Sequence, residues 1–66
     1  MMLECKYELG QMVYIKTDKE QMRRMVVSIS FRPTGVLYEL NCGVSNSWHY
    51  EMEVSEEKDV IAATTN

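Results

Sequence analysis

MVVSISFRPTGVLYELN, at residues 25–41, is the stretch that decides the fold. In its first part every odd position from 25 to 31 is apolar, and β-branched residues are frequent, which is typical of a strand. The RPTG sequence at 32–35 favours a tight turn, because proline presets its own φ and glycine readily adopts a positive φ. The pattern predicts a strand followed by a type I turn with a glycine bulge.

Residues 36–41 predict the return strand of this hairpin. Alternate side chains of a strand point to opposite faces of the sheet. One face would carry Val36, Tyr38 and Leu40, and the other Leu37, Glu39 and Asn41. Two alternating segments joined by a turn of this kind predict a β-hairpin at the centre of the domain.

Two further alternating segments flank the hairpin. Residues 12–16 predict a strand that begins just after Gly10, with Val13 and Ile15 sharing one face. Residues 47–54 predict another strand. Its core side would carry Trp48, Tyr50, Met52 and Val54, and its solvated side His49, Glu51 and Glu53.

The segments between these strands predict loops and one helical turn. In residues 17–24, Asp18 with Gln21 fits a capping box and Glu20 with Arg24 fits an i,i+4 pair, but so short a helix is marginal, so we expect a loop. Residues 55–59 predict a single helical turn capped by Ser55, and residues 60–63 a last strand. We therefore expect an all-β domain, a small five-stranded barrel whose closure removes exposed edges.

Two blocks of this sequence resemble small SH3-like β-barrel proteins of unknown function from bacteria, phages and mobile elements. The first is YELGQMVYIKTDKEQMRRMVVSI, with its pattern at Leu9, Gly10, Val13, Ile15, Lys16 and Thr17, and the second is RPTGVLYELNCG followed by SWHYE. Together they cover residues 7 to about 59. The resemblance implies an SH3-like fold, which is reused for peptide, nucleic-acid and oligomer contacts. Many such modules carry an acidic residue after the glycine, where this chain has Gln11.

Length and composition predict one small folded domain spanning residues 1–66, with 1–6 and 64–66 flexible. A chain this short buries only about 60% of its unfolded surface, which leaves no room for a deep catalytic pocket. The apolar fraction of 45% and the net charge of −3 favour a globule over disorder. We expect a cytoplasmic protein, because the sequence shows neither an apolar run of about 20 residues nor a secretory signal.

The chemically reactive side chains cluster in NCGVSNSWHYE, residues 41–51. Two cysteines and one histidine, without close pairs, are too few for a structural zinc site. Cys42 and His49 could in principle form a thiolate–imidazole pair, but the strand pattern directs His49 away from the core. We therefore expect no enzyme activity, metal or cofactor. We expect Cys5 and Cys42 to be reduced thiols, and a single disulfide between them is the alternative.

Charge is unevenly distributed along the chain. Residues 1–35 carry six basic and four acidic side chains, and residues 36–66 one basic and six acidic side chains. Solvated strand faces and loops would explain this distribution. A basic end and an acidic end that steer self-association or a charged partner would also explain it.

These observations favour a non-enzymatic interaction module that self-associates and binds a protein partner. Methionine suits adaptable apolar surfaces, and the candidate interaction face comprises Met12, Tyr14, Met25 and Leu37. The alternative is a small barrel that binds nucleic acid or a nucleotide, including a phage counter-defence protein, although a pI near 5.0 opposes it. The candidate contacts to a ligand or charged partner are Arg23, Arg24, Arg32, Tyr38, Trp48 and His49.

Overall fold

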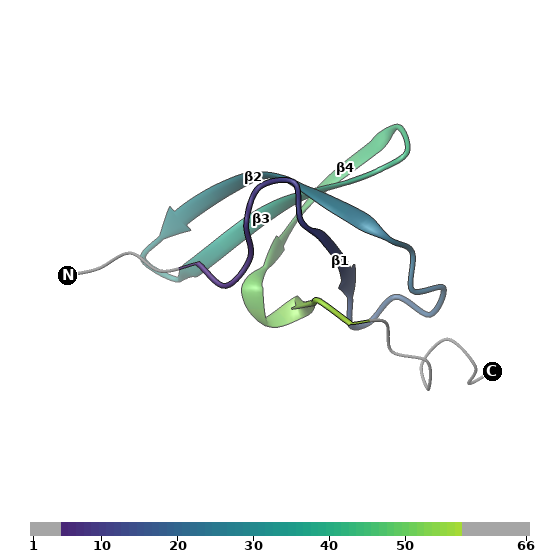
Figure 1. Cartoon of the computed structure of the whole chain (residues 1–66). Helices are drawn as coiled ribbons and strands as arrows, with labels where there is room; N and C mark the ends of the chain where they lie inside the picture. The colour runs from purple at the N-terminus through teal and green to yellow at the C-terminus, as the bar shows by residue number, and fades with distance from the viewer. Residues whose placement is uncertain (1–4, 58–66) are drawn as a thin grey trace.

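The computed structural model describes residues 5–57, which form one antiparallel sheet of five strands (Figure 1). The strands are β1 (Met12–Ile15), β2 (Arg24–Arg32), β3 (Gly35–Cys42), β4 (Ser45–Tyr50) and β5 (Val54–Ser55). A 3₁₀ turn, η1 (Glu51–Glu53), joins β4 to β5. The strand order is β4-β3-β2-β1-β5, so the all-β prediction is confirmed. The sheet is open in the described residues, and barrel closure stays a prediction.

The central hairpin predicted from the sequence is confirmed. β2 pairs with β3 from Met25 opposite Asn41 to Arg32 opposite Gly35, and the turn lies at Pro33 and Thr34. Gly35 has a φ of 138°, which a residue with a side chain rarely adopts. This hairpin makes the most extensive pairing in the sheet.

A β-bulge at Val27 divides β2 into two halves with opposite parity. Val26 pairs with Leu40 and Ser28 pairs with Glu39, so Val27 has no partner of its own on β3. Val26 is buried before the bulge, whereas Ile29 packs on the core after it. The odd positions of β2 therefore do not form one continuous face, although all of them are apolar, because the extra residue reverses the alternation.

The faces predicted for β4 are wrong. The connection between β3 and β4 is only Gly43-Val44, so Cys42 pairs with Ser45 and the register follows from there. His49 lies opposite Tyr38, on the core side, and Trp48 lies opposite Glu39, on the other side. A shift of one residue in such a register exchanges the two faces of a strand. Trp48 is 48% exposed and Met52 is 78% exposed.

The helical turn lies earlier than predicted. It is η1, which ends the predicted strand 47–54 at Tyr50, and Val54 and Ser55 then pair with Ile15 and Tyr14 of β1 as β5. Ser55 is thus a strand residue, and residues 56 and 57 form a bend instead of a helix. The rest of the predicted turn and the predicted strand 60–63 lie outside the described residues.

The core is small and lies on one side of the sheet. Val13 and Ile15 are buried as predicted, together with Val54 from β5. The ring of Tyr7 packs edge-on against that of Tyr38, with 5.3 Å between the ring centroids. The buried apolar residues of the described chain are Tyr7, Val13, Ile15, Val26, Tyr38, Leu40 and Val54.

The segment between β1 and β2 is a loop, as expected, but its hydrogen bonds differ from a capping box. The Asp18 carboxylate accepts the backbone N–H groups of Glu20 and Met22, each at 3.0 Å. Arg24 donates to Asp18 at 3.2 Å and not to Glu20 as the i,i+4 spacing suggested. The buried Gln21 side chain donates to the carbonyls of Ile15 and Asp18. The loop is therefore held by local polar contacts.

Candidate interaction surface

The face of the sheet opposite the core carries an exposed apolar surface. Cross-strand neighbours share a face, so the registers of β1 to β4 define three rows that we call the outer face. The rows are Met12–Met25–Asn41–Asn46, Ser28–Glu39–Trp48 and Ser30–Leu37–Tyr50. The candidate residues Met12, Met25 and Leu37 are thus brought together on one face. Tyr14 lies on the same side of β1 as Met12, but opposite Ser55 of β5.

The apolar side chains of the outer face differ in exposure. Met25 is 41% exposed, and Trp48 and Tyr50 are exposed as well. Met12 and Leu37 are half-buried between their neighbours. The alternation of the sequence directed Trp48 and Tyr50 to the core; Trp48 was expected only as a contact to a ligand or charged partner, and Tyr50 was not expected at a contact surface. The short β3–β4 connection is the signal that could have placed them.

Polar groups lie among the apolar side chains of the outer face. Glu39 stands in the middle row, between Ser28 and Trp48. Asn41 donates to the side-chain oxygen of Asn46 at 2.7 Å, and Asn46 donates to Glu39 at 3.4 Å. Arg32 donates to the Ser30 hydroxyl at 3.0 Å. A non-obligate protein–protein interface is similarly mixed, with about as much apolar area as the rest of a protein surface.

The six candidate contacts for a ligand do not form one site, although His49 and Tyr38 are cross-strand neighbours on the core side. Tyr38 is fully buried, on the core side of β3, whereas Trp48 lies on the outer face. Arg24 is paired with Asp18, while Arg23 and Arg32 are exposed. A base could not stack on Tyr38, since its ring has no exposed surface.

A hydrogen-bonded network around the Tyr38 hydroxyl ties the N-terminal segment to η1. Tyr38 donates to the Glu51 carboxylate at 2.6 Å and accepts the backbone N–H groups of Lys6 at 2.9 Å and Tyr7 at 3.2 Å. Lys6 also donates its backbone N–H to Glu51 at 3.0 Å, so the Lys6 N–H contacts both members of the Tyr38–Glu51 pair. Glu51 was expected on a solvated strand face, a prediction that the turn at η1 overturns.

The same network shifts two ionisation equilibria. Burial, and the hydrogen bond to Glu51, raise the pKa of Tyr38 to about 12. The hydrogen bonds from Tyr38 and from the Lys6 backbone lower the pKa of Glu51. Near neutral pH the pair is therefore a neutral phenol donating to a carboxylate, which is a charge-assisted and strong arrangement.

His49 forms a second polar cluster with residues before and after it. Its Nε2 lies 2.6 Å from the Ser47 hydroxyl, and its Nδ1 lies 3.4 Å from the Glu53 carboxylate. A hydroxyl, a base and a carboxylate thus follow one another, which is the order of groups found in nucleophilic catalytic sites. Neither of the two pockets described below includes Ser47 or His49. The cluster also joins the end of β4 to η1.

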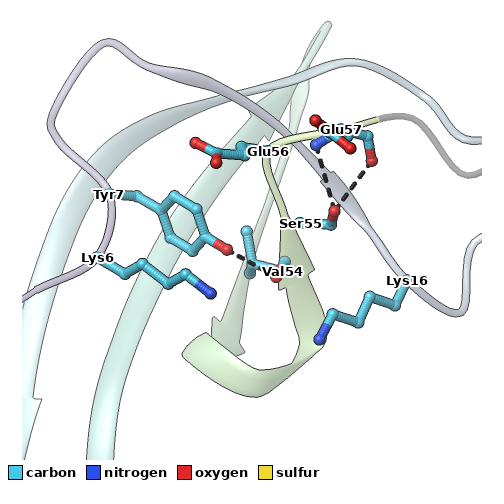
Figure 2. Close-up of a pocket in the computed structure, with 7 residues that line it drawn as sticks. All are labelled: Lys6, Tyr7, Lys16, Val54, Ser55, Glu56 and Glu57. Atoms are coloured by element: carbon cyan, nitrogen blue, oxygen red, sulfur yellow. Dashed lines mark hydrogen bonds between the residues drawn. The ribbon is translucent and has the colours of Figure 1, made fainter.

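Two shallow pockets lie at the ends of the sheet. One, of about 320 Å³, is lined by Lys6, Tyr7, Lys16, Val54, Ser55, Glu56 and Glu57 (Figure 2). Lys6 and Lys16 extend along the two sides of β5, and the Tyr7 hydroxyl donates to the Val54 carbonyl at 2.9 Å (Figure 2). The second, of about 310 Å³, lies between the β2–β3 turn and η1, beside Tyr50 and Met52. The first pocket combines two cations with two carboxylates, so it has no strong preference for a ligand of one sign.

Several other features bear on chemistry. Among residues 5–57, no group of three or more His, Cys, Asp or Glu side chains is arranged to hold a metal ion. Cys5 and Cys42 are free thiols, the first exposed and the second half-buried. No helix in the described part of the chain is long and apolar enough to cross a membrane.

No protein-family model matches the chain, and neither a curated protein nor a solved structure gave a match.

Proposed function

We propose that this protein is a non-enzymatic interaction module that binds protein, its own copies included, through the outer face of its sheet. The observation that carries the proposal is the exposed set of Met25, Trp48 and Tyr50 on that face, uncovered by any other described segment. Several large apolar side chains exposed on one face of a small domain favour a contact site there.

The distribution of apolar side chains supports the same proposal. The described chain buries seven apolar residues, whereas nine large apolar residues are exposed. A domain of this size has a thin core and gains stability from a partner that covers more apolar surface. A protein partner removes such surface from water, at about 25 cal/mol per Å² before the costs of association.

We further propose that the fold is SH3-like. Support comes from the strand order, the tight central hairpin, the single 3₁₀ turn between β4 and β5, and the pairing of β5 with β1. A fold of this type positions its sheets and loops for contacts but does not by itself select a partner.

Two matched substitutions test the role of the outer face. Trp48 and Met22 are 48% and 43% exposed, but only Trp48 belongs to the outer face. Light scattering at high micromolar concentration should give a mass above the 7.7 kDa monomer for the natural protein and for Met22→Asp. Trp48→Asp should be monomeric. A natural protein that is strictly monomeric would remove the self-association part of the proposal, and equal behaviour of the two variants would exclude the outer face.

A further inference from the structure

The free edge of β4 is the least protected part of the sheet. β4 pairs with β3 on one side, and no strand among the described residues pairs with its other side. Its sequence, Ser45–Tyr50, contains no proline, Lys, Arg, Asp or Glu, and no bulge interrupts its pairing. Natural edge strands usually carry one of these features, because an exposed edge is a template for another strand. β5, at the opposite edge, has only two residues and is followed by Glu56 and Glu57.

The register of β4 shows which backbone groups lie at this edge. A two-residue connection makes Cys42 and Ser45 a hydrogen-bonded pair, and such pairs alternate along an antiparallel ladder. The backbone groups of Asn46, Trp48 and Tyr50 therefore point away from β3. The Tyr50 N–H confirms this direction, since it donates to the Glu53 side chain at 3.1 Å.

We propose that β4 pairs antiparallel with β4 of a second copy, with Trp48 of the two copies meeting on the two-fold axis. This inference rests on the proposed function, because it specifies the geometry of self-association. Asn46 and Trp48 supply the N–H donors, and Tyr50 and Trp48 of the second copy supply the carbonyl acceptors, while the Tyr50 N–H stays with Glu53. In the paired strands, Trp48 faces Trp48 of the second copy and Asn46 faces its Tyr50.

The parity of the strand restricts the possible registers. Partners across a ladder share a face, so an outward residue of β4 can face only another outward residue. With Trp48 on the axis, residues 46–50 of both copies pair, and the two indole rings lie against each other, which adds an aromatic cross-strand contact. On the core side, Ser47 then faces His49 of the second copy, and these are groups that already hydrogen-bond within one chain at 2.6 Å.

Charge favours a second copy as the occupant of this edge. The chain has a net charge of −3, which opposes self-association in general, but β4 has no acidic or permanently basic side chain. Two acidic groups lie near this edge: Glu53 accepts the Tyr50 N–H at its end, and Glu39, on β3, is the nearest on the outer face. In the paired dimer, the two copies of Glu39 lie three strand spacings apart, about 14 Å, which exceeds the screening length of about 8 Å at physiological salt.

Disulfide trapping tests the register directly. In a Cys5→Ser/Cys42→Ser background, Trp48→Cys should form a covalent dimer under mild oxidation, since paired Cα atoms about 5.5 Å apart suit a disulfide. Asn46→Cys and Tyr50→Cys should each fail to cross-link alone but cross-link when mixed. Circular dichroism confirms that each variant is folded. The proposed register would be overturned if Asn46→Cys cross-linked with Trp48→Cys in place of these combinations. It would also be overturned if no variant cross-linked.

A backbone substitution tests edge pairing without an oxidant. Asn46→Pro removes the N–H that faces the second copy, and edge positions of a sheet tolerate proline. Asn46→Ala is the matched control, since it removes the same side-chain contacts but keeps the N–H. Sedimentation should give a dimer dissociation constant at least about tenfold higher for Asn46→Pro than for Asn46→Ala.

The outcomes separate this inference from the proposed function. If folded Asn46→Pro associates as Asn46→Ala does while Trp48→Asp is monomeric, the outer face remains the contact surface and β4 pairing is wrong. If the natural protein is a strict monomer at high micromolar concentration, β4 pairing and the self-association part of the proposed function are both wrong.

Discussion

The Tyr38 hydroxyl donates a 2.6 Å hydrogen bond to the carboxylate of Glu51, and this contact joins the centre of β3 to the turn that follows β4. The Tyr38 hydroxyl also accepts two backbone N–H groups from the N-terminal segment. Three segments far apart in the sequence thus meet at one oxygen atom. In a domain with so few buried side chains, this polar junction fixes how the N-terminal segment and η1 lie against the sheet.

Tyr38→Phe should lower the free energy of unfolding by about 2 kcal/mol, because it leaves the backbone N–H of Tyr7 without its acceptor and Glu51 without its strongest donor. Urea denaturation followed by circular dichroism measures the change. Tyr50→Phe is the control, since it removes an exposed bond to Thr34 and should cost no more than about 0.5 kcal/mol. Equal costs for the two variants would show that the junction contributes nothing.

The pH dependence of stability should report on Glu51. Its pKa is lowered in the folded protein from the ordinary value of 4.5, so ionised Glu51 stabilises the fold above that pH. As the pH falls through the folded pKa, this contribution is lost. The difference in unfolding free energy between the natural protein and Glu51→Gln should be constant from pH 7 to about 5 and shrink below about 4.5. The pKa of Asp18 is lowered too, mainly by the hydrogen bond from the Met22 N–H. This effect is the same in both proteins, so it cancels in the difference. A difference that did not change with pH would exclude this role.

The bulge in β2 predicts opposite sensitivities for two adjacent valines. Val26 is 1% exposed and packs in the core, whereas Val27 is the unpaired residue of the bulge and is 40% exposed. Val26→Ala should destabilise the protein by about 2 kcal/mol, and Val27→Ala by no more than about 0.5 kcal/mol. Thermal or urea unfolding of the pair gives the comparison directly. The opposite order would mean that the odd positions of β2 face the core throughout.

The local alternation of the sequence predicted β1, the hairpin and which residues of β3 share a face, because one buried face imposes a period of two on each strand. It could not locate the bulge, since Val26 and Val27 are both apolar and either could be the extra residue. The polar start of β4, Ser45-Asn46-Ser47, has low strand propensity, so the sequence placed the strand too late. Trp48 was then assigned to the core on the assumption that large apolar residues are buried. Buried residues are mostly apolar, but many apolar residues are exposed. Glu51 was misplaced because the strand pattern continued across the turn at η1.

Trp48 also provides a test against nucleic-acid binding. It is the only tryptophan in the chain and lies on the outer face beside Glu39, while Tyr38 is buried and Arg24 is paired with Asp18. A single-stranded oligonucleotide titrated at low salt should therefore leave Trp48 fluorescence unchanged, because binding needs a positive groove as well as stacking surfaces. Free tryptophan titrated with the same oligonucleotide corrects for absorption by the bases. Quenching that saturates at low salt and disappears at high salt would contradict the protein-binding proposal and favour a nucleic-acid ligand, with Arg23 and Arg32 as the accessible basic contacts.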